Sequence, residues 1–199
     1  IKDEVEQIVD YIRYAGKQTE KRLKKDIRSR VLEAYEITNN IYQNNKSSKN
    51  KQEISERIKE ALRPIRYNKG RGYYFILNSQ GVNQLMPISP ELEQTSLLHN
   101  QDSQGNYFIK EMLEEVVSKN GEAFHKYHFK KPASPEKDSP KISFVKYFAP
   151  FDWYIGTGEY LDDVKEDIQQ EVIARLDKIK LKNERYVFTG QWDGMIMTG

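Results

Sequence analysis

The chain has 199 residues and a mass of 23.5 kDa, which fits one ordinary domain of roughly 100 to 200 residues with room for an extension. Hydrophobic residues make up 37% and the mean hydropathy is −0.84, so a folded core is expected, and no apolar run approaches the ~18 residues of a membrane span. Cysteine is absent, which excludes disulfides, thiolate metal sites and a cysteine nucleophile. Because the chain opens on Ile1 rather than Met, we expect it to be part of a longer protein.

The charges are distributed unevenly along the chain. Residues 1–69 carry 17 Lys and Arg against 11 Asp and Glu, a difference of +6, whereas residues 70–199 carry 15 against 19, a difference of −4. A basic segment of this kind can bind nucleic acid. Here acidic residues interleave with the basic ones, as in Lys24-Lys25-Asp26, which is typical of a solvated helix face. We therefore expect no nucleic-acid partner.

The first forty-odd residues predict one long helix. Apolar and small residues recur at steps of three or four from Val5 to Ile41, which places them on one stripe of an α-helix. At 1.5 Å per residue this helix is roughly 60 Å long, so we expect it to pack against another chain or to project from its domain. The polar segment 44–48 ends it, and a second helix capped by Ser47 or Ser48 follows. Residues 1–69 are thus predicted to be helical.

Residues 70–182 show a different pattern, with short strands arranged around one helix. Runs of β-branched and aromatic residues between turns predict the strands, and apolar steps of three or four predict the helices. The predicted strands are Tyr73–Leu77, Val82–Met86, Ala123–Phe129, Ile142–Phe148 and Trp153–Tyr160, with helices over Asn106–Lys119 and 161–182 and a proline-rich loop over Lys131–Pro140. This order predicts an α+β fold, in which the long N-terminal helix packs on a PAS-like five-stranded antiparallel sheet and the chain exits as a helix.

The end of the chain contains a weak internal repeat. Aligning residues 185–194 (RYVFTGQWDG) with residues 72–81 (GYYFILNSQG) superposes Tyr186 on Tyr73, Phe188 on Phe75 and Gly194 on Gly81. The later segment also follows a helix, as the earlier one does. We expect residues 183–199 to begin a second, similar module.

Several segments in a fixed order resemble the Cache sensor domains. They are GYYFILNSQG at 72–81, Met86-Pro87, Asp102-x-x-Gly105 before FIKEM at 108–112, PKISFVKYF at 140–148, and FDWYIGTGEY at 151–160 followed by Asp162-Asp163. The last two segments are the most similar, and they resemble the type-2 Cache branch. The resemblance extends from about residue 5 to residue 180.

This resemblance implies an extracytoplasmic ligand-sensing domain of a bacterial membrane receptor, which would be a chemoreceptor, a histidine kinase or a cyclic-dinucleotide enzyme. It implies a small organic acid as ligand, of the pyruvate, lactate, acetate or propionate class. No cofactor and no catalytic residue within this chain are implied. Many relatives have His-Pro where this chain has Met86-Pro87, and Tyr where it has Phe144. Both departures make the expected pocket more apolar.

A small carboxylate needs a cation or several N–H donors, together with apolar walls. Lys146 lies in an apolar run and shares a strand face with Phe144 and Phe148 by alternation, so it is the expected partner of the carboxylate. The competing interpretation is a lysine stem that covers a partly solvated edge. Lys141 has the opposite parity and is expected to lie on the surface.

Other side chains could complete the site. Gly156-Thr157-Gly158 would let a ligand approach the backbone, or would mark a bend without a ligand. Tyr74 and Tyr127 could supply hydroxyls or simply pack in the core. The candidate ligand-binding residues are Tyr74, Met86, His99, Phe108, Tyr127, Phe144, Lys146, Gly156, Thr157 and Gly158.

Two further functions compete with ligand sensing. His125 and His128 point to opposite faces of a strand and cannot converge on a metal, so no metal site is expected. A dimerising or structural module without a small-molecule ligand is the alternative, because the stripe that starts at Val5, Ile8 and Ile12 has the spacing of a helix pair. The drift to steps of four after Thr19 departs from a strict coiled coil. A homodimer through the long helix is compatible with both functions.

Overall fold

The computed structural model describes residues 2–131, 134–176, 189–190 and 196–198. The chain divides into two compact units, of which one is Leu23–Leu161 and the other combines Ile1–Arg22 with Asp162–Gly199. The first unit contains the main sheet and all candidate site residues. The second unit contains α4 (Leu161–Leu176) and the short pair β6 (Thr189–Gly190) and β7 (Ile196–Thr198).

The main sheet has five antiparallel strands in the order β2-β1-β5-β4-β3. The strands are β1 (Phe75–Asn78), β2 (Asn83–Leu85), β3 (Glu122–Lys131), β4 (Ser134–Phe148) and β5 (Trp153–Tyr160). β5 lies at the centre, because it pairs with β1 on one side and with β4 on the other. The predicted α+β fold with a five-stranded antiparallel sheet is confirmed.

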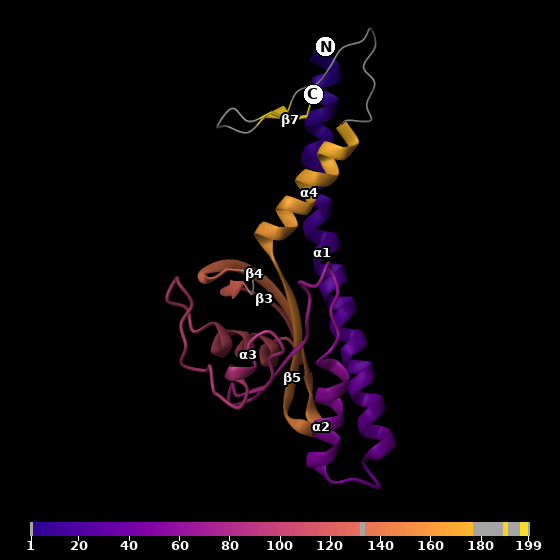
Figure 1. Ribbon diagram of the computed structural model, residues 1–199, viewed down its shortest axis with the longest axis vertical. Coiled ribbons are helices and arrows are strands. Elements are labelled where there is room, and N and C mark those ends of the chain that lie inside the picture. The colour runs from indigo at the N-terminus through magenta and orange to yellow at the C-terminus, as the bar shows by residue number, and fades with distance from the viewer. Residues whose placement is uncertain (1, 132–133, 177–188, 191–195, 199) are drawn as a thin grey trace. The chain divides into compact units, whose positions relative to one another are not determined.

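Helices cover both faces of this sheet (Figure 1). The helices of the unit are α1 (Lys2–Asn45), of which residues 23–45 belong here, α2 (Lys51–Leu62), α3 (Phe108–Ser118) and the single turns η1 (Pro90–Leu92) and η2 (Ala149–Phe151). Helix α2 begins at a capping box in which Asn50 accepts from the Glu53 N–H at 2.9 Å and Glu53 accepts from the Asn50 N–H at 3.1 Å. The cap is therefore Asn50 rather than the predicted Ser47 or Ser48.

Alternation along the strands separates two hydrophobic cores. The α1 face packs against α1 and α2, and its core includes Tyr74, directly before β1, and Ile76, Phe148, Trp153 and Ile155 from the sheet. The α3 face packs against α3 and the loops that flank it, and its core includes Tyr73, Phe75, Leu77, Tyr127, Val145 and Tyr154. Because both faces are covered, β5 is buried along its whole length, and so are Phe75–Leu77 of β1 and residues 141–145 of β4.

The β3–β4 hairpin extends beyond the predicted strand ends. Lys131–Pro140 was expected to be a loop, but residues 134–140 belong to β4 and pair with β3 as far as Lys131↔Ser134. The last pair between β4 and β5 is Lys141↔Tyr160. Beyond it β4 has a single neighbour, where a proline such as Pro140 is tolerated because only one side of the strand is bonded to another strand.

The C-terminal predictions are tested only in part. The exit helix predicted over 161–182 is described as far as Leu176. Most of the repeat at 185–194 lies outside the described residues, so the second module remains a prediction. Over the ranges that the structure describes, no helix is both long and apolar enough to cross a membrane.

Candidate functional site

The most unusual group on the α3 face is the ammonium of Lys141. This side chain comes from β4 and is only 1% exposed. Its Nζ donates a hydrogen bond to the Tyr73 hydroxyl at 2.6 Å, and within the described part of the chain no carboxylate lies within ion-pair distance of it. Buried charges are normally paired. Lys141 is therefore a cation placed inside the fold without an anionic partner of its own.

Aromatic rings surround this ammonium. Nζ lies 4.5 Å from the ring centroid of Tyr73, 4.8 Å from that of Tyr160 and 5.5 Å from that of Phe129, within the range of cation–π attraction. Burial lowers the pKa of Lys141 to about 7, and the negative charge of Glu159 acts in the opposite direction. The site can therefore gain or lose a proton near neutral pH.

A small cavity of about 10 Å³ lies beside Lys141, which is room for about one water molecule. It is lined by Tyr73, Phe75, Leu77, Met86, Leu97, Phe108, Ile109, Tyr127, Phe129 and Lys141. All of these side chains except Lys141 and the two tyrosines are apolar. The cavity thus combines one cation and two hydroxyl-bearing rings with apolar walls, which is the composition of a small-ligand site.

Tyr127 is the second hydroxyl-bearing side chain of the cavity wall. Its hydroxyl hydrogen-bonds the Ser143 hydroxyl at 3.0 Å. Burial raises the pKa of Tyr127 to about 12 and that of Tyr73 well above its ordinary value, so both rings keep their protons at neutral pH. A Cβ on Gly158 would lie 2.2 Å from Ser143 Oγ, and this glycine therefore makes room for the serine.

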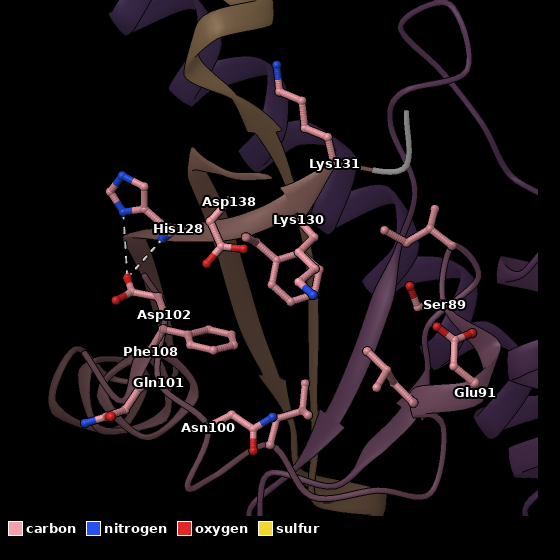
Figure 2. A pocket seen from close by; sticks show the side chains of 14 residues that line it. Ser89, Glu91, Asn100, Gln101, Asp102, Phe108, His128, Lys130, Lys131 and Asp138 are labelled. Carbon is pink, nitrogen blue, oxygen red and sulfur yellow. Dashed lines mark hydrogen bonds and ion pairs between the residues drawn. The ribbon is translucent and has the colours of Figure 1, made fainter. Parts of the chain in front are cut away.

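A larger chamber of about 490 Å³ adjoins the cavity (Figure 2). The two spaces share Leu97, Phe108 and Phe129 as a common wall. The chamber has a polar side, where Asn100, Gln101, Asp102, His128 and Asp138 are found. Separation of the shared wall would open a path from the chamber to Lys141.

Asp102 holds the loop before α3 against β3. Its carboxylate accepts from the backbone N–H groups of Gln104 at 2.9 Å, Asn106 at 3.0 Å and His128 at 3.1 Å. Burial opposes ionisation, yet these donors together keep the pKa of Asp102 below its usual value. Figure 2 shows Asp102 and the His128 ring side by side. Because the Asp102 carboxylate accepts these three backbone hydrogen bonds, its role is to fix this loop.

The structure divides the predicted site residues between the two faces. Met86, Phe108 and Tyr127 line the cavity. Gly156 and Gly158 lie on the same face, but a Cβ on Gly156 would meet the Phe75 ring at 2.4 Å, so these glycines make room for protein side chains. Tyr74, Phe144, Lys146 and Thr157 belong to the α1 face. His99 is exposed and lies in a separate hollow with Tyr107 and Lys110.

Lys146 stabilises the contact between the sheet and α1. Its Nζ donates to Glu122 at 2.8 Å and lies 5.2 Å from the centroid of the Tyr35 ring. Glu122 also accepts from Arg28 of α1 at 2.7 Å. The structure does not bring Lys146 to the cavity. The prediction that Lys141 is a surface residue is wrong, because α3 and its flanking loops cover the face that was taken for solvent.

Seven residues of the cavity wall were not among the predicted site residues, namely Tyr73, Phe75, Leu77, Leu97, Ile109, Phe129 and Lys141. One signal for Lys141 was available, since Tyr127, a candidate hydroxyl, pairs with it directly in the β3–β4 register. The two histidines also have separate partners, Glu115 for His125 at 3.2 Å and Asp102 for His128 at 3.7 Å. Among the described residues no group of three or more candidate metal ligands occurs.

Residues 1–199 match the family model described as "Cache domain" (dCache_2). The chain is 29% identical over 119 residues to the sensor histidine kinase MctS of Rhizobium johnstonii and 28% identical over 114 residues to the methyl-accepting chemotaxis protein McpP of Pseudomonas putida. These matches cover 60% and 57% of this chain but only 25% and 20% of the relatives. The chain therefore corresponds to a minor part of each relative.

Solved structures share the fold. The periplasmic sensor domain of a chemotaxis protein superposes with a TM-score of 0.66 at 28% identity, over 71% of this chain and 96% of that one. A second structure, described as the basis for carboxylic acid recognition by a Cache chemosensory domain, superposes with a TM-score of 0.66 at 23% identity, over 73% and 98% of the two chains.

Proposed function

Because this chain belongs to the Cache domain family, we propose that it is the extracytoplasmic ligand-sensing domain of a bacterial transmembrane receptor and that it binds a small monocarboxylate at Lys141. The single observation that carries the proposal is the buried ammonium of Lys141, which has no carboxylate partner among the described residues. A ligand carboxylate would supply the missing counter-charge. The role first expected for Lys146 passes in this proposal to Lys141.

The chemistry of the cavity favours a short acid. A carboxylate accepts charge-assisted hydrogen bonds from an ammonium and neutral ones from hydroxyl groups, and Lys141, Tyr73 and Tyr127 offer both kinds. The remaining wall is apolar and suits one or two methyl or methylene groups. Acids of the acetate, propionate, pyruvate and lactate class have this size and polarity. A solved Cache domain described as recognising carboxylic acids supports the same ligand class.

Binding requires the cavity to expand, because about 10 Å³ does not hold even acetate. The shared wall of Leu97, Phe108 and Phe129 is the part that separates the cavity from the larger chamber. We expect the ligand to enter through this chamber and to displace that wall. The bound and free states then differ in packing on the α3 face, which is the condition for a ligand to shift a conformational equilibrium.

The wider context is also part of the proposal. The relatives include a histidine kinase and a chemotaxis receptor, so the output is proposed to lie in another part of the full protein, and no enzymatic step is assigned to this chain. A homodimer through α1 is proposed from its apolar stripe, and sedimentation velocity of the chain with and without ligand tests it.

Calorimetric titration of the chain with acetate, propionate, pyruvate and lactate, one at a time, tests the ligand class. At least one acid is expected to bind with a micromolar to millimolar dissociation constant. An uncharged amide of the same size, propionamide beside propionate, is the matched control and is expected not to bind. Absence of binding by all four acids, or equal binding of the amide, would contradict the proposed ligand class.

A further inference from the structure

A series of contacts crosses the sheet from Lys141 to helix α1, and all of them lie within the unit Leu23–Leu161. Tyr73 accepts from Lys141 through its hydroxyl on the α3 face. The backbone carbonyl of the same residue accepts a hydrogen bond from the Thr157 hydroxyl at 2.6 Å. Thr157 is fully buried in β5 with its side chain on the α1 face. Tyr73 and Thr157 therefore join the cavity to the opposite side of the sheet.

Tyr67 continues this path toward α1. Its hydroxyl hydrogen-bonds the Thr157 hydroxyl. A threonine hydroxyl has a single proton, and Thr157 already donates it to Tyr73, so Tyr67 is the donor in this pair. Burial raises the pKa of Tyr67 far above its ordinary value, which keeps this donor proton in place at any physiological pH.

The Tyr67 ring is fixed from two sides. On one side it lies against Gly72, where a Cβ would come within 2.1 Å of the ring atom Cε2. The Arg30 guanidinium of α1 also lies 5.0 Å from the ring centroid, and Glu33 holds that guanidinium by a hydrogen bond of 3.0 Å. No sequence pattern singled out Tyr67 or Arg30, and Thr157 was expected to bind ligand as part of Gly156-Thr157-Gly158.

We propose that Tyr67 and Thr157 form a tether that transmits a change at Lys141 to the segment of α1 around Arg30. The inference rests on the proposed function, because an incoming carboxylate competes with the Tyr73 hydroxyl for the Lys141 ammonium. A shift of Tyr73 moves the carbonyl that Thr157 bonds, and Tyr67 and Arg30 follow through one hydrogen bond and one ring contact. Thr157 and Tyr67 are positioning residues in this scheme and do not touch the ligand.

Amide hydrogen exchange over residues 27–38 of α1 measures the transmitted change. With propionate at a saturating concentration, exchange in this segment of the wild-type chain is expected to change by at least threefold. Thr157→Val and Tyr67→Phe each remove one hydroxyl and keep the packing volume, and both are expected to lose most of this response at saturation. Thr157→Ser retains the hydroxyl and is expected to keep it.

Tyr42→Phe is the matched control, because Tyr42 also bridges α1 and the sheet, but through its ring, which lies 6.0 Å from that of Phe148. This variant is expected to respond as the wild type does. A wild-type chain that binds propionate without any change in residues 27–38 overturns the tether. A response retained in both Thr157→Val and Tyr67→Phe overturns it as well.

If propionate does not bind, whichever of the other three acids binds takes its place. If none of the four binds, the ligand class fails, and the tether is tested without ligand. Lys141→Met then serves as the change in the cavity, since it removes the hydrogen bond to Tyr73. Exchange over residues 27–38 is expected to differ between Lys141→Met and wild type. It is expected not to differ between the double variant Lys141→Met/Thr157→Val and the single variant Thr157→Val. Equal effects in both backgrounds, or no effect in either, overturn the tether independently of the ligand.

Discussion

The Lys141 ammonium donates its hydrogen bond to the hydroxyl of Tyr73, 2.6 Å away, although strand β5 lies between β4, which contains Lys141, and β1, which Tyr73 precedes. A neutral hydroxyl satisfies one of the three ammonium protons and none of its charge. The pair therefore stabilises the position of Lys141 while leaving its charge open to an anion. The pH dependence of both stability and binding follows from this arrangement.

Lys141 is expected to make the ligand-free protein less stable at low pH than at high pH. Burial lowers the pKa of Lys141 from 10.5 to about 7, so between these values the unfolded chain binds more protons than the folded one. The free energy of unfolding therefore gains a contribution that rises with pH, by at most about 1.4 kcal/mol per unit. Urea denaturation of wild type and Lys141→Met from pH 6 to pH 9 measures it.

Lys141→Met removes the buried charge and keeps an unbranched side chain that is one atom shorter. At pH 6 this variant is expected to be more stable than wild type by on the order of a few kcal/mol. The difference is expected to shrink as the pH rises through 7 and beyond. If the difference in unfolding free energy between Lys141→Met and wild type were the same at all pH values, the charge of Lys141 would not differ between the folded and unfolded states.

Carboxylate binding is expected to weaken above pH 7 for the same reason. The acid binds the protonated ammonium, and in the free protein the pKa of Lys141 is about 7. The affinity should be nearly constant from pH 5.5 to 6.5 and should then fall by up to about tenfold per pH unit. Calorimetry at pH 8 in buffers of different ionisation enthalpy should detect proton uptake on binding. A pH-independent affinity from 6 to 9 would contradict this mechanism.

Gly158→Ala is expected to destabilise the fold by about 1–3 kcal/mol through overpacking. The added Cβ would lie 2.2 Å from Ser143 Oγ and 2.5 Å from the carbonyl oxygen of Ile142, and the backbone atom cannot rotate away. Ser143→Ala is the control, since it removes the same serine hydroxyl without adding an atom. Thermal denaturation compares the two. If Gly158→Ala costs no more than Ser143→Ala, the glycine is not needed for packing.

Asp102→Asn is expected to loosen the loop before α3 without unfolding the sheet. An amide oxygen accepts more weakly than a carboxylate, and three backbone N–H groups depend on Asp102. Exchange of the amides of Gln104, Asn106 and His128 should become at least fivefold faster. Glu114→Gln, at an exposed position of α3, is the control. Unchanged exchange of these three amides would show that the carboxylate does not hold the loop.

The fold was largely predictable from the sequence because its signals are local. Alternating aromatic and β-branched residues identified each strand, and turn residues such as Gly81 and Gly121 separated them. The β3–β4 hairpin was the exception. Its outer half contains Pro135 and Pro140, which signal a loop, and only the pairing of β4 with a single neighbour beyond Lys141 explains how they fit in a strand.

The site was less predictable because alternation identifies a face but not what covers it. Lys146 and Lys141 have opposite parity in β4, and the apolar neighbours of Lys146 marked its face as internal. In the structure both faces are internal, and the neighbours of Lys141 that matter come from the segment before β1, from β3 and from β5, namely Tyr73, Phe129 and Tyr160. Lys141 and Tyr73 are 68 residues apart in the chain, and no local sequence pattern connects residues over that separation.

Lys141, and not Lys146, is proposed to bind the carboxylate. Calorimetric titration of wild type, Lys141→Met and Lys146→Met with the same acid at pH 6.5 tests it most directly, because the two lysines lie in one strand on opposite faces of one sheet. We predict that Lys141→Met weakens binding by at least about 100-fold, the loss expected for a buried charged hydrogen bond, while Lys146→Met stays within threefold of wild type. Undiminished binding by a folded Lys141→Met variant would show that the acid binds elsewhere.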